Sequence, residues 1–468
     1  MTDKDAQQND DLKLLIPEEI RYNCQGCGRC CSGWSVGLSE ADYSRVKDVD
    51  WGSLHPDLAN KELFIHRQDQ FKQGLAQYPH FTKPRKDGTC PFLIDGLCFI
   101  HGHMGEEQKP GTCQIFPYSY VETPTGIYMG LAYNSMASVR NIGELLTDQE
   151  EKLKGYFRKT VRHLNARAAD RPADTAAGAP AEMHTPANPF DEVDFAAGAS
   201  VPWSEFLHFD ARLTGFLKQA MDEKRNFFDV LVQAEEIVLR ATRLAREGKS
   251  LSELADYQPD ITASGAGNPS GTDVSIIAMI YYLYLVYPTV RSSYEELWQI
   301  QGQSFDPRSI MMIGKKFGHL ASTGISTILF KKAEIPQIGS NDLSKSLNYK
   351  VEPLSPEMNE LFCRWLYVKI FGKTYFGPAA AGYSVVSGFN SLVACFVCAM
   401  LFAKGEAMKR GEKELKIADL YEAYWRLDRE FLTVTQILPQ VSAALSIAYS
   451  IPRMARRVVL ALANNARQ

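Results

Sequence analysis

Seven of the ten cysteines lie in the first quarter of this 468-residue chain. Four of them form the run Cys-Gln-Gly-Cys-Gly-Arg-Cys-Cys, and three follow further along the same segment. They are Cys24, Cys27, Cys30, Cys31, Cys90, Cys98 and Cys113. Thiolate is the softest ligand among the side chains, and several thiolates at short spacing select zinc or an iron–sulfur cluster. The sequence therefore predicts a metal site held by these cysteines.

The spacing of the first three cysteines favours an iron–sulfur cluster. Cys24-x-x-Cys27-x-x-Cys30 is similar to the ferredoxin loop that supplies three ligands of one 4Fe-4S cluster. Cys90 directly precedes a proline, as the fourth ligand of such runs commonly does. The spacing leaves open which four cysteines ligate, and seven thiolates also suit two metal sites.

Zinc is the alternative metal. A structural zinc site takes four cysteines, often as paired Cys-x-x-Cys hooks, and the hooks here are not cleanly paired. We expect the side chains of the adjacent Cys30 and Cys31 to diverge, so that they do not bind the same zinc ion. Two histidines, His101 and His103, lie between the later cysteines, and we interpret both as polar loop residues in preference to ligands.

The other three cysteines, Cys363, Cys395 and Cys398, fall in strongly apolar helical patterns. A buried thiol behaves as a small hydrophobic side chain. We therefore interpret these three as core residues, although two of them form a Cys-x-x-Cys spacing.

Bulk properties exclude some classes of function. A net charge of -4 argues against nucleic acid as the main partner, because the phosphate backbone requires a basic surface. The longest apolar stretches are shorter than the ~20 residues that span a bilayer. The polar, acidic start at Met1–Asp5 does not resemble a signal peptide. We expect a cytoplasmic protein, where clustered cysteines bind metal and do not form disulfides.

The pattern along the chain predicts an α+β protein in three parts. Residues 1–145 form a loop-rich, cysteine-cluster metal-binding domain with a small β-hairpin, whose strands lie near 118–121 and 127–129. Residues 146–201 hold a charged helix, predicted over 144–167, and a flexible Ala/Pro-rich linker from 168 to 201. Residues 202–468 are mostly helical, with one helix from Pro356 to about Gly372 and a buried helix around 389–402.

Three motifs carry a resemblance to a known family. They are Cys24-x-x-Cys-Gly-x-Cys-Cys, Cys90-Pro-Phe-Leu-x-x-Gly-x-Cys98 and Pro110-x-x-Cys113-x-x-Phe-Pro117. Together they resemble the bacterial cysteine-cluster (YkgJ-type) family of zinc- or iron-chelating domains, whose superfamily includes the flagellin lysine N-methylase. The resemblance implies an iron–sulfur cluster on the motif cysteines. Through the methylase branch it implies transfer of a methyl group from S-adenosylmethionine to lysines of a protein substrate such as flagellin.

The chain departs from the family pattern at two positions. Ser135 stands where relatives usually carry a further cysteine, and Gln114 stands where they usually carry arginine. The chain also lacks a strand followed by a Gly-rich turn and a helix, the pattern that cradles an adenosyl cofactor in a Rossmann sheet. We interpret Gly265-Ala266-Gly267 as part of a loose loop.

The first hypothesis is an iron–sulfur protein, which the resemblance to the methylase branch implies to be an S-adenosylmethionine-dependent protein-lysine N-methyltransferase. The alternatives are a non-catalytic zinc- or iron-binding structural or redox module, and a metal-chelating carrier. Neither a catalytic residue nor a residue that binds S-adenosylmethionine is assigned from the sequence.

Overall fold

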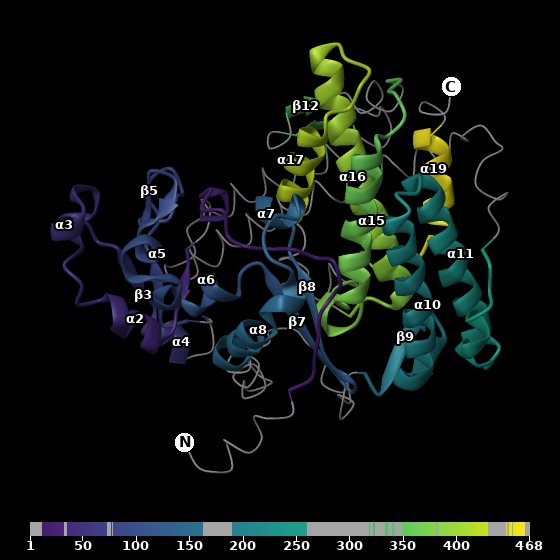
Figure 1. The fold of residues 1–468 in the computed structure, drawn as a ribbon, viewed down its shortest axis with the longest axis horizontal. Helices are drawn as coiled ribbons and strands as arrows, with labels where there is room; N and C mark the ends of the chain where they lie inside the picture. Colours follow the sequence, from purple (N-terminus) through teal and green to yellow (C-terminus); the bar gives the residue numbers. More distant parts are fainter. Residues whose placement is uncertain are drawn as a thin grey trace. The chain divides into compact units, whose positions relative to one another are not determined.

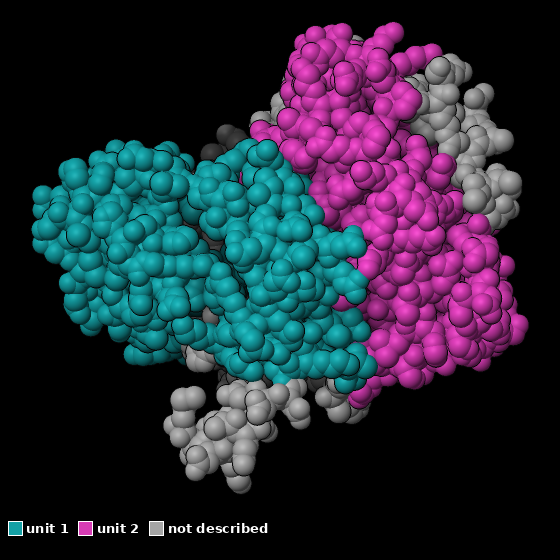
Figure 2. Space-filling view, viewed as in Figure 1, with its two compact units in different colours: residues 1–184 teal, residues 185–468 magenta. Residues whose placement is uncertain are grey.

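A computed structural model describes residues 12–161, 190–259, 349–428 and 453–463, apart from 32–34, 73–75, 77 and 381. Short pieces between 318 and 341 and between 446 and 451 are also described. The chain divides into two compact units, residues 1–184 and 185–468, which are coloured separately in Figure 2.

Unit 1 is built from short strands and short helices (Figure 1). Two three-stranded sheets have the orders β2-β4-β3 and β1-β8-β7, and β5 and β6 form a separate hairpin. The strands are β1 (Leu14–Leu15), β2 (Gly37–Leu38), β3 (Phe64–His66), β4 (His80–Thr82), β5 (Leu93–Ile94), β6 (Leu97–Cys98), β7 (Tyr118–Thr123) and β8 (Gly126–Leu131). The helices are α2 (Glu40–Val46), α3 (Trp51–Leu54), α4 (Gln68–Lys72), α5 (Phe99–Met104), α6 (Gly111–Ile115), α7 (Met136–Val139) and α8 (Glu150–Tyr156).

A small apolar core lies beside the cysteine motifs in unit 1. Trp51 contacts Phe92 and Phe99 edge-on, with ring centroids 4.8 and 6.3 Å apart. The side chains of Cys90 and Cys98 pack against this core from its partly buried edge. The core therefore supports the segment that carries these two thiols.

Unit 2 consists of a β-hairpin and long helices (Figure 1). The hairpin pairs β9 (Glu192–Ala196) with β10 (Ala199–Pro202). The helices are α10 (Trp203–Asp222), α11 (Phe227–Arg246), α15 (Pro356–Phe371), α16 (Val385–Arg410), α17 (Ile417–Leu427) and α19 (Met454–Ala463), and a second short hairpin joins β11 (Ala333–Ile335) to β12 (Gly339–Asn341). Phe227, Phe362 and Phe396 pack together from α11, α15 and α16, with ring centroids 4.9 to 5.1 Å apart. Such aromatic contacts hold the helices to one another.

The α+β class is confirmed, with short sheets in unit 1 and a mostly helical unit 2. The predicted hairpin is β7 and β8, which pair antiparallel from Tyr118↔Leu131 to Thr123↔Gly126. The predicted start and end of α15 are also confirmed, because the Ser355 side chain caps the helix and Gly372 follows its last residue.

Two other predictions differ from the structure. The charged helix predicted over 144–167 begins as a 3-10 turn at Leu146–Gln149, and α8 covers Glu150–Tyr156. The linker predicted up to residue 201 is wrong for its last part, because β9 and β10 form a hairpin in which Val193, Phe195 and Val201 are buried. These apolar residues alternate with polar ones, a strand pattern that the Ala-rich composition obscured. Residues 162–189 and 260–317, including the predicted loop at 265–267, lie outside the described residues.

Helix α16 is long and apolar enough to cross a membrane by length and composition. However, 89% of its most apolar stretch is buried inside the protein, against α11, α17 and α19. Among the described residues it is the one helix that is long and apolar enough to span a membrane. Its burial is typical of a helix in a protein core.

Candidate metal centre

Six of the seven N-terminal cysteines line one cavity of about 380 Å³ in unit 1. They come from three separate segments and are Cys24, Cys30, Cys31, Cys90, Cys98 and Cys113. None of these six described cysteines forms a disulfide bond. Cys27 is exposed and belongs to the same loop as Cys24 and Cys30, but it is not among the residues that line the cavity. The fold thus brings together residues that lie up to 89 positions apart in the sequence (113 − 24).

The first segment, residues 24–31, turns tightly because of two glycines. Gly26 and Gly28 have φ values of +65° and +67°, a backbone conformation that favours glycine. The loop ends in a 3-10 turn over Arg29–Cys31, where the amide of Cys31 donates to the carbonyl of Gly28 at 2.9 Å. This turn places Cys30 and Cys31 on the same side of the backbone.

The expectation that Cys30 and Cys31 diverge is wrong. Their sulfur atoms are 4.0 Å apart. A tetrahedral metal with metal–sulfur bonds of ~2.3 Å places its sulfurs roughly 3.8 Å apart. The 3-10 turn therefore gives these neighbouring thiols a spacing at which both can bind one metal ion.

The second segment carries Cys90, three residues before the β5–β6 hairpin begins, and Cys98, the last residue of β6. The amide of Cys90 donates to the carbonyl of Cys31 at 2.8 Å, which ties this segment directly to the first. The hairpin turns at Asp95 and Gly96, whose φ values are +50° and +77°. Leu97 at the end of the turn is 59% exposed yet lines the cavity.

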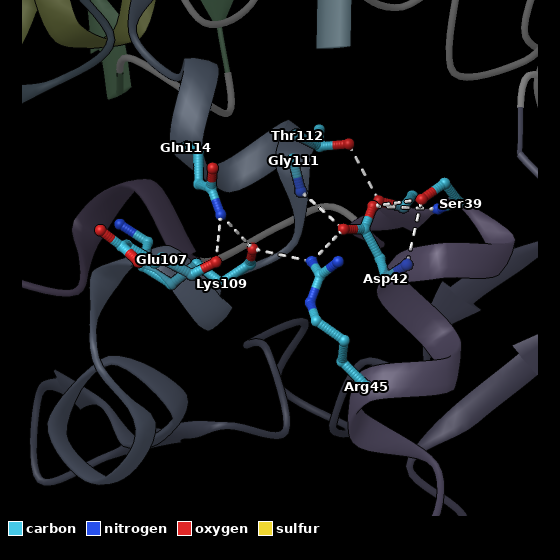
Figure 3. A network of polar contacts seen from close by, with 9 residues as sticks. Ser39, Asp42, Arg45, Glu107, Lys109, Gly111, Thr112 and Gln114 are labelled. Carbon is cyan, nitrogen blue, oxygen red and sulfur yellow. Dashed lines mark hydrogen bonds and ion pairs between the residues drawn. The ribbon is translucent and has the colours of Figure 1, made fainter. Parts of the chain in front are cut away.

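The third segment carries Cys113 in α6 and is tied to α2 by a polar network (Figure 3). The Asp42 carboxylate accepts a hydrogen bond from the amide of Gly111 at 3.2 Å and forms an ion pair with Arg45. It also accepts from the amide and hydroxyl of Ser39, at 3.1 and 2.8 Å, as part of a capping box. One buried carboxylate therefore caps α2 and holds the start of α6.

Gln114, which replaces the usual arginine of the family, stabilises the loop before Cys113. Its side-chain amide is buried and donates to the carbonyls of Glu107 and Lys109, at 2.8 and 2.7 Å (Figure 3). These bonds tie the start of α6 to the loop that precedes it.

Ser135, which replaces the usual cysteine, is buried next to the cavity wall. Its side chain hydrogen-bonds to the phenol of Tyr22, and Tyr22 lines the cavity and interacts electrostatically with Cys24 and Cys30. The position that the family pattern fills with a thiol thus holds a hydroxyl in this chain.

The surroundings of three cavity thiols, those of Cys30, Cys90 and Cys113, favour the neutral form. Burial raises the pKa of Cys90 to about 11 and the pKa of Cys113 well above the usual value of a thiol. A hydrogen bond with Cys31, and then burial, raise the pKa of Cys30. Since metals bind the thiolate form, binding here would release protons.

The donor set fits a thiophilic metal, but the thiols surround the cavity without meeting at one point. Within the described part of the chain, no three Cys, His, Asp or Glu side chains are close enough together to form a metal-ligand group. The six sulfurs are instead distributed over the wall of the cavity.

Residues other than cysteine also reach the cavity. His101 on α5 lines it, whereas His103 stacks on Phe99 with ring centroids 3.9 Å apart. Lys109 lines it as well and is 8% exposed. Lys109 has no distinguishing local pattern in the sequence, apart from its place directly before the Pro110–Cys113 motif.

The three later cysteines lie in unit 2. Cys363 is buried in α15, and Cys395 and Cys398 are buried in α16. Burial raises the pKa of Cys363 to about 12 and that of Cys398 well above the usual value. These thiols are core residues, as the apolar pattern predicted.

Comparisons with known proteins agree with the motifs. Residues 23–138 match a family model described as "CxxCxxCC: Putative zinc- or iron-chelating domain". An uncharacterized protein of Methanocaldococcus jannaschii is 33% identical over 102 residues, which are 21% of this chain and 30% of that protein. The chain thus aligns with under a third of that relative's length. No solved structure matches. Residues 23–138 therefore match the model of the zinc- or iron-chelating family that the cysteine motifs resemble, and this match supports metal binding.

Proposed function

We propose that unit 1 binds an iron–sulfur cluster in the cysteine cavity. The observation that carries this proposal is the distribution of six thiols around one cavity of about 380 Å³. A cluster occupies the space between its ligands, so its cysteines need to surround a volume. A single zinc ion needs only four donors, within ~2.3 Å of one point, whereas six thiols line this cavity. A bound cluster would supply a redox-active, Lewis-acidic centre to this cavity.

The chain's own residues would hold the cluster and shield it. Cys24, Cys30, Cys31, Cys90, Cys98 and Cys113 supply more thiols than one 4Fe-4S cluster needs, and Cys27 stays a predicted ligand on the exposed part of the loop. Apolar side chains of Phe92, Ile100 and Phe116 form part of the wall and limit the access of water. Hydrogen bonding and exclusion of solvent around cluster sulfurs tune the cluster's potential.

The first test is elemental analysis and absorption spectroscopy of anaerobically purified protein. We expect iron and acid-labile sulfide, with absorption in the visible region. Both should be lost in Cys113→Ser and kept in Cys398→Ser, because Cys113 lines the cavity and Cys398 lies in the core of unit 2. Cys27→Ser, which we also expect to lose metal, tests the exposed thiol of the first loop.

The outcome that contradicts an iron–sulfur cluster is stoichiometric zinc without sulfide. The 4.0 Å separation of the Cys30 and Cys31 sulfurs would then mark two ligands of a zinc ion. The function supported in that case is the non-catalytic structural module. Equal metal content in Cys113→Ser and Cys398→Ser would contradict the site itself.

The size of the cavity favours a second candidate, an S-adenosylmethionine-dependent protein-lysine N-methyltransferase. A volume of about 380 Å³ lies within the range of small-molecule pockets, ~300–1,000 Å³. The wall combines apolar side chains with a few polar groups, among them His101 and Lys109. In this reaction the methyl group leaves the sulfonium for a neutral lysine amine, and S-adenosylhomocysteine and a proton are released.

Binding of S-adenosylmethionine to the metal-loaded protein tests this candidate. Equilibrium dialysis with the radiolabelled cofactor should show saturable binding that S-adenosylhomocysteine displaces. We then expect methyl transfer to lysines of a protein substrate, with flagellin the first to try. Absence of binding to protein that holds its cluster would reject the methyltransferase and leave the metal site intact.

A further inference from the structure

Lys109 carries a positive charge into the wall of the cysteine cavity. Its side chain lines the cavity and is 8% exposed. Its charge interacts with the thiols of Cys113, Cys24 and Cys98, which belong to all three cysteine segments. A buried ammonium group costs free energy unless an opposite charge lies near it.

No carboxylate within the described residues is ion-paired with Lys109. Glu106 is near enough to interact with it electrostatically, but its carboxylate forms an ion pair with Lys152 at 3.0 Å. The same carboxylate accepts a hydrogen bond from the hydroxyl of Tyr156 at 3.2 Å. The thiols of the cavity are thus the groups that could become the countercharge of Lys109.

The backbone around Lys109 is fixed by the network of Figure 3. Its carbonyl accepts from the side chain of Gln114 at 2.7 Å and from Arg45 at 3.5 Å. The amide of Cys113 donates to the carbonyl of Pro110, the next residue, at 2.8 Å. The backbone position of Lys109 is therefore tied to the segment that carries Cys113.

We propose that Lys109 is the counter-ion of the metal centre: its ammonium group stabilises the negative charge that the centre carries when thiolates bind it. This inference rests on the proposed metal site of unit 1. An iron–sulfur cluster with four thiolates is anionic and becomes more so on reduction, and net charge and surroundings set its potential. A fixed positive charge in the wall favours the reduced cluster and strengthens the binding of any metal held by several thiolates.

The test compares Lys109→Met with Lys109→Arg, which keeps the charge. Lys86→Met is the matched control, because Lys86 is an exposed lysine of the same unit that does not line the cavity. Two readouts are used: the affinity of the metal-free protein for Co²⁺, followed by the thiolate-to-cobalt absorption, and the midpoint potential of the reconstituted cluster. Far-UV circular dichroism checks that each variant is folded.

We expect Lys109→Met to bind Co²⁺ at least roughly tenfold more weakly, as a charge within several ångströms at intermediate dielectric would require. Its cluster should have a more negative midpoint potential. Lys109→Arg and Lys86→Met should stay within about twofold of the native affinity. If Lys109→Met does not fold, Lys109→Gln takes its place, with the same expectation.

Native Co²⁺ affinity in the uncharged variant would overturn the counter-ion role. Equal losses in Lys109→Arg and Lys109→Met would also overturn it, because they would show that side-chain shape matters and charge does not. A failure of the iron–sulfur proposal is distinguishable, since native protein would then hold zinc without sulfide. The Co²⁺ comparison would still decide the role of Lys109 in that case.

Discussion

At the scale of single residues, the first cysteine loop depends on a glycine that another residue could not replace. Gly28 has a φ of +67°, and a Cβ atom there would lie 2.8 Å from Leu93 Cδ1 and 3.0 Å from the carbonyl oxygen of Gly96. Both contacts are shorter than ordinary van der Waals distances. The absence of a side chain at Gly28 therefore allows the first cysteine segment to pack on the β5–β6 hairpin.

We expect Gly28→Ala to weaken both the fold of unit 1 and its metal binding. Gly96→Ala is the matched control, because Gly96 has a similar φ of +77° but open space around it. In the control, the strain of the left-handed backbone should lower the free energy of unfolding by about 1–2 kcal/mol. Gly28→Ala should lower it further because of the added steric contacts. Chemical denaturation and metal content measure the difference. Equal losses in the two variants would contradict the packing argument.

The sequence indicated that the N-terminal cysteines belong together, and six of the seven line one cavity, while their role as metal ligands stays a prediction. The groups around them could not be predicted from the sequence. Asp42 binds the amide of Gly111, 69 positions away (111 − 42), and Lys109 interacts electrostatically with Cys24, 85 positions away (109 − 24). No local sequence pattern indicates interactions between residues so far apart. The spacing of the Cys30 and Cys31 sulfurs also depends on a 3-10 turn that the sequence did not indicate.

At the scale of elements, α2 acts as the support for the third cysteine segment. Its capping box shares the Asp42 carboxylate with the amide of Gly111, at the start of α6. The hydroxyl of Thr112 adds a second tie, donating to the carbonyl of Gly37 in β2 at 2.9 Å. The position of Cys113 is therefore set by a helix and a strand that contribute no ligand.

We expect Asp42→Ala to reduce metal binding as well as stability. The change removes a helix cap, worth about 1 kcal/mol, and leaves the amide of Gly111 and the guanidinium of Arg45 without their partner. Asp50→Ala is the control, since Asp50 caps α3 through the amide of Ser53 and does not contact a cysteine segment. Denaturation should show a loss in both variants, and Co²⁺ titration a loss only in Asp42→Ala. Unchanged Co²⁺ affinity in Asp42→Ala would show that α6 holds Cys113 in place without α2.

Element boundaries were predictable where the local signal is strong. Ser355, Pro356 and Gly372 mark the ends of α15 by capping chemistry that acts within a few residues. The β9–β10 hairpin is not evident in the sequence, because the Ala-rich stretch before it suggests a linker. Its three buried apolar side chains pack against helices of unit 2, and this packing stabilises the hairpin. Tertiary packing therefore determines the secondary structure of this segment, and local composition does not predict it.

At the scale of the whole molecule, the two units are stabilised in different ways. Unit 2 has long helices with many buried aromatic side chains, and a buried ion pair joins Lys373 to Asp210 at 2.8 Å. Unit 1 has strands of two to six residues, short helices and a cavity lined by six cysteines. A metal that binds only the folded cavity would therefore add stability to unit 1 and little to unit 2.

Removal of the metal should accordingly loosen unit 1 alone. We expect anaerobic chelation to speed amide hydrogen exchange at least roughly tenfold in residues 24–31 and 90–114, because a ligand in large excess over its dissociation constant contributes several kcal/mol to the folded state. Peptides from α15 and α16 should exchange at their original rates. Mass spectrometry of the full chain measures both regions in one experiment, and Cys398→Ser should respond like the native protein. Faster exchange throughout the chain would show that the metal stabilises both units together, and unchanged exchange in residues 24–31 would show that the cysteine loops keep their fold without it.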